Sequence, residues 1–204
     1  MIRCLALTVV LVFGLSADPL NLVSNGGFET GDFSGWSVSG NITPCLFVGT
    51  GNDPRCIPTT GIGAHTGSYA AELGNAGGDA SLTQNLATTA GATYELTFWL
   101  ASQAYGTPAN DFSVSWDNQT IYSAVNLNAF GYTLYDFKGL TTAGSSTALS
   151  FSFYNSPSFL VLDDISVVDP PGVSEPDARP FWLLAFAIIA LAGGTLARVR
   201  RRSV

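Results

Sequence analysis

The chain of 204 residues is poor in charged residues, in cysteine and in histidine. Charged residues make up 11% of it, under half of the roughly 25% usual in soluble domains. This scarcity indicates a membrane segment, or a surface of Ser, Thr, Asn and Gly typical of exported β proteins. The single histidine, His65, is the only available base for a Ser-His-Asp triad, and it leaves too few ligands for a zinc site.

Basic residues are almost absent from the middle of the chain. Between residues 18 and 172 the two bases Arg55 and Lys138 stand against 13 of the 15 acids, a net charge of -11. Such a field repels phosphate backbones, which excludes nucleic-acid binding. An acidic polysaccharide would also be repelled unless calcium bridges it, so a neutral glycan or a metal-dependent contact is favoured.

Residues 1–17 are typical of a secretory signal peptide. A basic start with Arg3 is followed by an apolar run over residues 4–15, and Ser16 and Ala17 provide a small-residue cleavage site. Cleavage after Ala17 would start the mature chain near residue 18. We therefore expect an exported protein; the alternative is a short buried strand or helix.

The other end of the chain predicts a transmembrane helix. Residues 181–197 are 17 uncharged residues, and a helix of that length spans ~25 Å, close to the ~30 Å of a hydrocarbon core. The cluster of arginines that follows comprises Arg198, Arg200, Arg201 and Arg202. Positive charge stays in the cytoplasm, so we expect residues 198–204 inside and residues 18–180 outside. A soluble buried helix is the alternative.

A linker over residues 170–180 precedes this span and holds a short motif, Val173, Ser174, Glu175 and Pro176. This motif, the apolar stretch and the terminal arginines together resemble the PEP-CTERM sorting signal of Gram-negative bacteria. The resemblance implies recognition by an exosortase, which removes the tail, in bacteria that make extracellular polysaccharide. The family pattern is V-P-E-P, and Ser174 stands where its first proline is usual. The alternative is a plain C-terminal anchor that stays attached.

Between residues 21 and 169 the sequence predicts strands and no amphipathic helix of useful length. Apolar residues alternate with polar ones in several short runs bounded by Gly, Asn, Ser and Pro. The apolar positions that share a face within each run are Tyr94, Leu96, Phe98 and Leu100; Phe112, Val114 and Trp116; Leu149, Phe151 and Phe153; and Val161, Ile165 and Val167. We therefore expect an all-β, two-sheet sandwich over residues 18–169.

A series of short motifs in this region resembles carbohydrate-binding-module and galactose-binding-like jelly rolls. The motifs are Asn25-Gly26-Gly27-Phe28-Glu29, Gly35-Trp36, the run His65 to Gly74, the run Leu82 to Leu86, and Leu162-Asp163-Asp164-Ile165. Together they cover nearly all of residues 21–168. The resemblance implies a jelly-roll sandwich, here flanked by a signal helix and a transmembrane helix, and less directly a sugar ligand.

The resemblance also implies a structural Ca²⁺ held by Glu29 with Asp163 or Asp164. Calcium takes six to eight oxygen ligands, and the neighbouring glycines allow a close approach of the chain. Alternation along the last strand places Asp163 on the face of Val161, Ile165 and Val167, so we expect it to point inward, to be buried and to need a partner. The alternative is an Asp pair hydrogen-bonded to backbone amides.

Two cysteines, Cys45 and Cys56, remain once Cys4 leaves with the signal peptide. Export places them in an oxidising compartment, where a disulfide closing this short loop would stabilise the fold by ~3 kcal/mol. A cysteine nucleophile is the alternative.

The carboxylates do not form the arrangement expected of a jelly-roll glycosidase. Glu29, Glu72 and Glu95 are isolated in the sequence, and no Glu-x-Asp-x-Glu pattern occurs. Trp99 and Tyr154 instead project from the faces opposite their buried neighbours, where they could stack on sugar rings. The alternative is that Trp99 packs under a loop or against the second sheet.

We therefore expect an exported, non-catalytic surface or extracellular-matrix protein that associates with extracellular polysaccharide. We also expect it to pass through the inner membrane as a transient single-pass protein before it reaches the cell surface. Two alternatives stay open: a hydrolase that acts on this polysaccharide, and a structural module with no glycan ligand.

Overall fold

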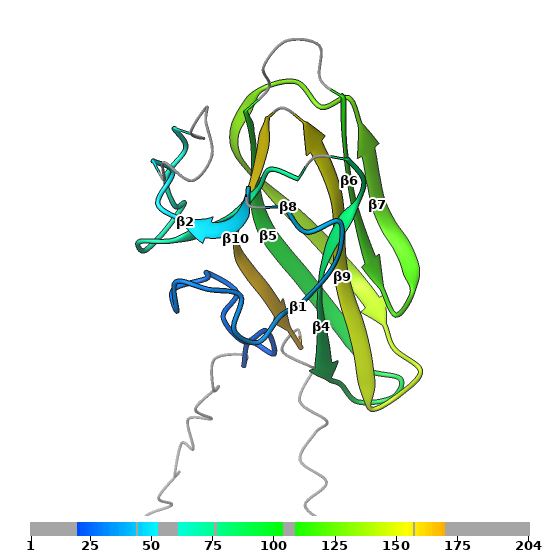
Figure 1. Cartoon of the computed structure of the whole chain (residues 1–204). Helices are drawn as coiled ribbons and strands as arrows, with labels where there is room; N and C mark the ends of the chain where they lie inside the picture. Colours follow the sequence, from blue (N-terminus) through cyan, green and yellow to red (C-terminus); the bar gives the residue numbers. More distant parts are fainter. Residues whose placement is uncertain are drawn as a thin grey trace, which may run out of the picture. The chain divides into compact units, whose positions relative to one another are not determined.

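Ten β-strands account for the regular structure in the described part of the chain (Figure 1). The computed structural model describes residues 20–43, 45–52, 61–75, 77–103, 109–156 and 158–169. The strands are β1 (Ser37–Gly40), β2 (Leu46–Gly49), β3 (Ala70–Leu73), β4 (Ala80–Ala87), β5 (Thr93–Gln103), β6 (Ala109–Trp116), β7 (Gln119–Val125), β8 (Phe130–Thr141), β9 (Ser146–Ser156) and β10 (Phe159–Val168).

The strands form two five-stranded sheets, in the orders β1-β4-β9-β6-β7 and β2-β3-β10-β5-β8. Every pairing between these strands is antiparallel. We call them the first and the second sheet. Neighbours in each sheet are often distant in sequence, as when β4 pairs with β9 and β3 with β10, so chain crossovers tie the two layers together.

The alternating apolar residues form the core between the two sheets. The predicted inward positions that lie in this core are Tyr94, Leu96, Phe98, Leu100, Phe112, Val114, Trp116, Leu149, Phe151, Phe153, Ile165 and Val167. Phe98 of the second sheet lies 5.2 Å, centroid to centroid, from Phe151 of the first. Burial of each such side chain stabilises the fold by ~1.5–3 kcal/mol. The predicted all-β, two-sheet sandwich is confirmed.

The last strand departs from the predicted alternation at Asp163 and Asp164. Its register with β5 shifts just after Asp163, and Asp164 has a φ of 49°. Val161 therefore packs on the outer face of the second sheet, whereas Ile165 and Val167 lie in the main core. The expectation that Asp163 shares the face of Ile165 and Val167 is wrong, because this bulge reverses the direction of the side chains.

A loop over residues 61–69 covers part of the outer face of the second sheet. Its Ile62 and Ala64 pack with Tyr132 of β8 against a small cluster formed by alanines of β3 and β5 and by Val161. This loop gives Asp163 a buried environment outside the main core.

The two chain ends lie outside the described residues. All described residues fall within the compact unit Met1–Pro170, and a second unit comprises Pro171–Val204. The predicted signal peptide, linker, transmembrane helix and arginine tail thus remain predictions. Within the described ranges, no helix is long and apolar enough to cross a membrane.

Candidate functional site

Hydroxyl groups cover the outer face of the first sheet. One row across all five strands consists of Ser39, Ser81, Ser152, Ser113 and Ser123, and the next consists of Ser37, Thr83, Ser150, Ser115 and Thr120. Neighbouring strands lie ~4.8 Å apart, so the ten side chains form a continuous polar surface without charge. We call these two lines the hydroxyl rows.

Hydrogen bonds between neighbouring strands hold part of this surface in place. The hydroxyl groups of Ser39 and Ser81 are 2.8 Å apart, and so are those of Thr83 and Ser150. Each hydroxyl can both donate and accept hydrogen bonds, so these pairs keep further capacity for a ligand. The rows therefore present both donors and acceptors to anything that lies across the sheet.

An aromatic ring and two acids lie beside the hydroxyl rows. Tyr154 of β9 is half-buried, and its register partner in β6 is Asp111. Asp79 comes directly before β4, whose first residue, Ala80, pairs with Phe153. Burial raises the pKa of Asp111, and the negative charge of Asp79 raises it further. Tyr154 therefore has Asp111 beside it on β6, and Asp79 precedes the strand on its other side.

The face lacks the cations that an acidic ligand would need. Lys138 is the one lysine or arginine side chain in the described part of the chain, and it lies on the second sheet. There its ammonium group is 3.4 Å from Glu95 and 3.2 Å from Asp136. With hydroxyls, a phenol ring and carboxylates, the face is suited to a neutral, hydroxyl-rich ligand.

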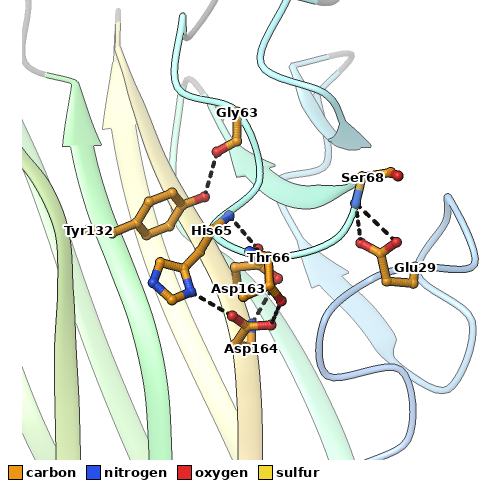
Figure 2. Close-up of polar contacts among 8 residues, drawn as sticks. All are labelled: Glu29, Gly63, His65, Thr66, Ser68, Tyr132, Asp163 and Asp164. Atoms are coloured by element: carbon orange, nitrogen blue, oxygen red, sulfur yellow. Dashed lines mark hydrogen bonds and ion pairs between the residues drawn. The ribbon is translucent and has the colours of Figure 1, made fainter.

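The predicted metal ligands meet around the loop over residues 61–69 (Figure 2). Asp163 is fully buried, and its Oδ2 accepts hydrogen bonds from the amides of His65 at 2.8 Å and Thr66 at 3.4 Å. Its Oδ1 accepts one from the amide of Asp164 at 2.8 Å. Burial raises the pKa of Asp163 to about 6, although these amide bonds oppose the shift.

The other two carboxylates hold the same loop. Asp164 accepts a hydrogen bond from the Thr66 hydroxyl through Oδ1 at 2.6 Å, and its Oδ2 lies 2.6 Å from Nδ1 of His65. Glu29 accepts bonds from the amides of Ser68 at 2.9 Å and 3.1 Å and of Tyr69 at 2.9 Å. The structure thus brings Glu29, Asp163 and Asp164 to one loop.

Gly27 lies beside the side chains of all three acids. A Cβ atom at this glycine would lie 3.4 Å from Oδ1 of Asp164, 3.7 Å from Oδ1 of Asp163 and 3.8 Å from Cγ of Glu29. The oxygen donors suit calcium in kind. No group of three or more His, Cys, Asp or Glu side chains within the described residues is arranged to hold a metal ion, however. Calcium at these residues stays a prediction.

Trp99 lies on the outer face of the second sheet, next to Asp163 in register. His65 stacks on its indole with the ring centroids 3.9 Å apart and the planes at 18°. Tyr132 meets His65 edge-on at 5.1 Å and donates a hydrogen bond to the carbonyl of Gly63. The loop therefore covers one face of Trp99, and Trp99 and Tyr154 lie on different sheets, so they cannot line one site.

Several predicted residues lie partly or wholly outside the described ranges. Cys45 comes just before β2, but Cys56 is outside, so their disulfide stays a prediction. The residues of the sorting motif and the membrane stop, all outside, are Val173, Ser174, Glu175, Pro176, Arg198, Arg200, Arg201 and Arg202.

Sequence reasoning identified Tyr154 and overlooked the hydroxyl rows. Their signal is present in the sequence as Ser or Thr at alternate positions, at 37 and 39, 81 and 83, 113 and 115, and 150 and 152. Each pair by itself is an ordinary polar strand face. The pattern gains meaning once the strand order shows that the pairs are neighbours.

Comparison with known proteins shows the fold. No protein-family model matches the chain, and no curated protein matches its sequence. A family 61 carbohydrate-binding module solved with β-1,4-galactotriose has a TM-score of 0.56 and 22% identity, covering 74% of this chain and 99% of that one. The chain is a jelly-roll β-sandwich of the kind found in carbohydrate-binding modules.

Two further solved structures are more distant. The CBM22-1 and GH10 modules of Clostridium thermocellum xylanase 10B, with xylohexaose, give a TM-score of 0.49 and 15% identity, covering 73% of this chain and 28% of that one. A family 16 carbohydrate-binding module gives a TM-score of 0.46 and 22% identity, covering 72% and 99%.

Proposed function

We propose that this protein is a non-catalytic module that binds a neutral polysaccharide across the outer face of its first sheet. The observation that carries the proposal is the pair of hydroxyl rows beside Tyr154, Asp79 and Asp111. The galactotriose ligand of the similar family 61 module supports the same class of ligand.

The chemistry of the face suits several sugar units bound together. A net hydrogen bond contributes ~0.5–1.5 kcal/mol, and bonds to a charged acceptor are roughly twice as strong. Stacking of a sugar ring on Tyr154 would place its hydroxyls near the acids on either side. Because each contact is weak, affinity comes from an extended chain that crosses several strands.

The positions of Glu72 and Glu95 oppose the hydrolase alternative. Glu72 pairs with Val161 and Glu95 with Val168, so they lie seven residues apart along β10. At about 3.3 Å per residue this separation is ~20 Å, well beyond the ~5–10 Å that paired glycosidase carboxylates require. Glu72 is also buried and accepts a hydrogen bond from the amide of Gly51.

Glycan binding by face variants tests the proposal. Affinity electrophoresis with galactan, xylan and β-glucan would be compared between the wild type, Tyr154→Ala and Ser113→Glu, which puts a charge in the middle of a hydroxyl row. The matched control is Leu134→Glu, at a residue 48% exposed on the second sheet. We expect both face variants to bind at least about tenfold more weakly, ~1.4 kcal/mol, and the control to bind normally.

Three results would overturn this assignment. Loss of binding in Leu134→Glu with normal binding in Ser113→Glu would place the ligand on the second sheet. Release of reducing ends that is lost in Asp111→Asn would show a hydrolase. Binding of polygalacturonate in preference to the neutral glycans would contradict the charge argument.

Export and sorting form the second part of the proposal, and they rest on the sequence. We propose that residues 1–17 direct export, that residues 181–197 hold the chain briefly in the inner membrane, and that an exosortase then removes the tail. The protein would then reach the cell surface or the surrounding matrix. Mass spectrometry of the mature protein with and without the exosortase tests this; residues 181–204 intact in both strains would refute it.

A further inference from the structure

A cavity of about 450 Å³ lies at one edge of the sandwich, where the β6–β7 turn approaches the end of β8. Its walls include Trp116, Asp117, Gln119, Ile121, Leu140 and Ala143. Pockets that hold small ligands commonly measure ~300–1,000 Å³, so this cavity is large enough for one or two sugar rings.

The cavity is separate from the hydroxyl rows. Trp116 and Gln119 are register partners, and so are Ser115 and Thr120. Because side chains alternate along a strand, the first pair points away from the face that carries the second pair. A polysaccharide on the hydroxyl rows therefore leaves the cavity free.

A fixed indole forms the apolar wall. Trp116 is 3% exposed, and its Nε1–H donates a hydrogen bond to the carbonyl of Thr141 at 2.7 Å. Its ring also lies 5.7 Å from that of Tyr94. Since the indole N–H is already engaged, the small part of the ring that reaches the cavity is apolar, and with Ile121 and Leu140 it suits the C–H face of a sugar.

A rigid turn carries the polar groups. Asp117 and Asn118 have φ values of 49° and 63°, which is typical of a two-residue hairpin turn, and the amide of Asp117 donates to the carbonyl of Ala148 at 2.9 Å. Within the described residues, neither the carboxylate of Asp117 nor the amide group of Gln119 makes a hydrogen bond. Both groups are therefore available to the hydroxyls of a ligand.

We propose that this cavity binds a single neutral sugar unit, such as a free monosaccharide or the end of a glycan chain. Trp116 would support the ring, Asp117 would accept hydrogen bonds from its hydroxyls, and Gln119 would donate and accept others. Lys138 adjoins Gly139 of the wall but is paired with Glu95 and Asp136, so an acidic sugar lacks a counter-charge here. The site does not depend on the hydroxyl rows.

A titration followed by amide NMR signals tests this site. Glucose, galactose, xylose and mannose would be added separately to the wild type, Asp117→Asn, Ala143→Trp and Tyr154→Ala. Asparagine tolerates the positive φ of residue 117, and Ala143 is exposed, so both variants should keep the fold. Unchanged signals from the rest of the spectrum verify this.

We expect at least one sugar to shift the amides of residues 117–121 and 142 in a saturable way. Asp117→Asn should weaken this binding about tenfold, Ala143→Trp should abolish it by filling the cavity, and Tyr154→Ala should leave it unchanged. Shifts that persist in Ala143→Trp, or none at these amides up to the solubility limit of every sugar, would overturn the proposal. If Tyr154→Ala loses polysaccharide binding but binds the single sugars normally, the defect lies at the hydroxyl rows and the cavity proposal stands.

Discussion

Substitution of Gly26 by alanine would test how the N-terminal segment is held against β10. The amide of Ile165 donates a hydrogen bond to the carbonyl of Gly26 at 3.0 Å, and the amide of Leu22 donates to Val167 at 2.8 Å. A Cβ atom at Gly26 would overlap the carbonyl oxygen of Ile165 and lie 3.0 Å from its carbon. The two backbones are in contact, so alanine cannot be accepted without moving them apart.

The cost of this substitution follows from the contacts that must change. Overpacking costs ~1–3 kcal/mol, and loss of the hydrogen bond between Ile165 and Gly26 adds ~1 kcal/mol. We therefore expect Gly26→Ala to lower the free energy of unfolding by ~2–4 kcal/mol. For a domain of this size the melting temperature falls ~2–4 °C per kcal/mol, so the expected decrease is roughly 5–15 °C.

The adjacent glycine provides a matched control. Gly27 has no positive φ, and its Cβ atom would make only ordinary contacts, of 3.4 Å or more. Gly27→Ala should change the free energy of unfolding by less than about 1 kcal/mol, and a small gain is expected from the less flexible unfolded chain. Urea denaturation of both variants measures the difference. Equal stability of the two variants would refute the close packing of Gly26 on Ile165.

Three further substitutions or conditions test other parts of the structure. Gln84→Ala should lower the free energy of unfolding by ~2–4 kcal/mol, because this buried side chain forms hydrogen bonds with the amide and the carbonyl of Ser24 and with the carbonyl of Gly35. Urea denaturation measures this change, and Asn85→Ala, at the exposed neighbouring residue, should have little effect in the same assay. If calcium binds beside Gly27, Ca²⁺ should raise the melting temperature relative to EDTA in the wild type and not in Gly27→Ala; equal values in the wild type would exclude the metal. Burial raises the pKa of Asp111, so the folded protein binds this proton more tightly than the unfolded chain does. The resulting contribution of Asp111 to stability is present when its carboxyl group is protonated and is lost as the pH rises through the raised pKa. The stability of the wild type relative to Asp111→Asn should therefore fall with rising pH in the acidic range, and a constant difference would contradict the burial.

Local alternation explains why much of the fold could be predicted. In β5, β6 and β9 the apolar residues at the predicted alternate positions all lie in the core, and Trp116 is buried as expected. A strand has a side-chain period of two whatever its neighbours are, so the sequence of one strand specifies its two faces. The outward positions of Trp99 and Tyr154 follow from the same rule.

The bulge in β10 marks the limit of that rule. Asp163 is buried as predicted, but on the outer face under a loop, because one irregular residue reverses the alternation. Nothing in the local pattern of apolar residues distinguishes this arrangement from a regular strand. The loop that covers Asp163 comes from about a hundred positions earlier in the chain, as the bond from His65 shows.

The sequence alone thus determined the all-β class, the acidic and cation-poor character of the domain, and the direction of most side chains. Only the tertiary structure decided that the paired serines and threonines of five strands join into two continuous rows, that His65 covers Trp99, and that a cavity forms beside Trp116. The reason is physical: the direction of a side chain is set by its own backbone, whereas the composition of a surface depends on which distant strands and loops become neighbours.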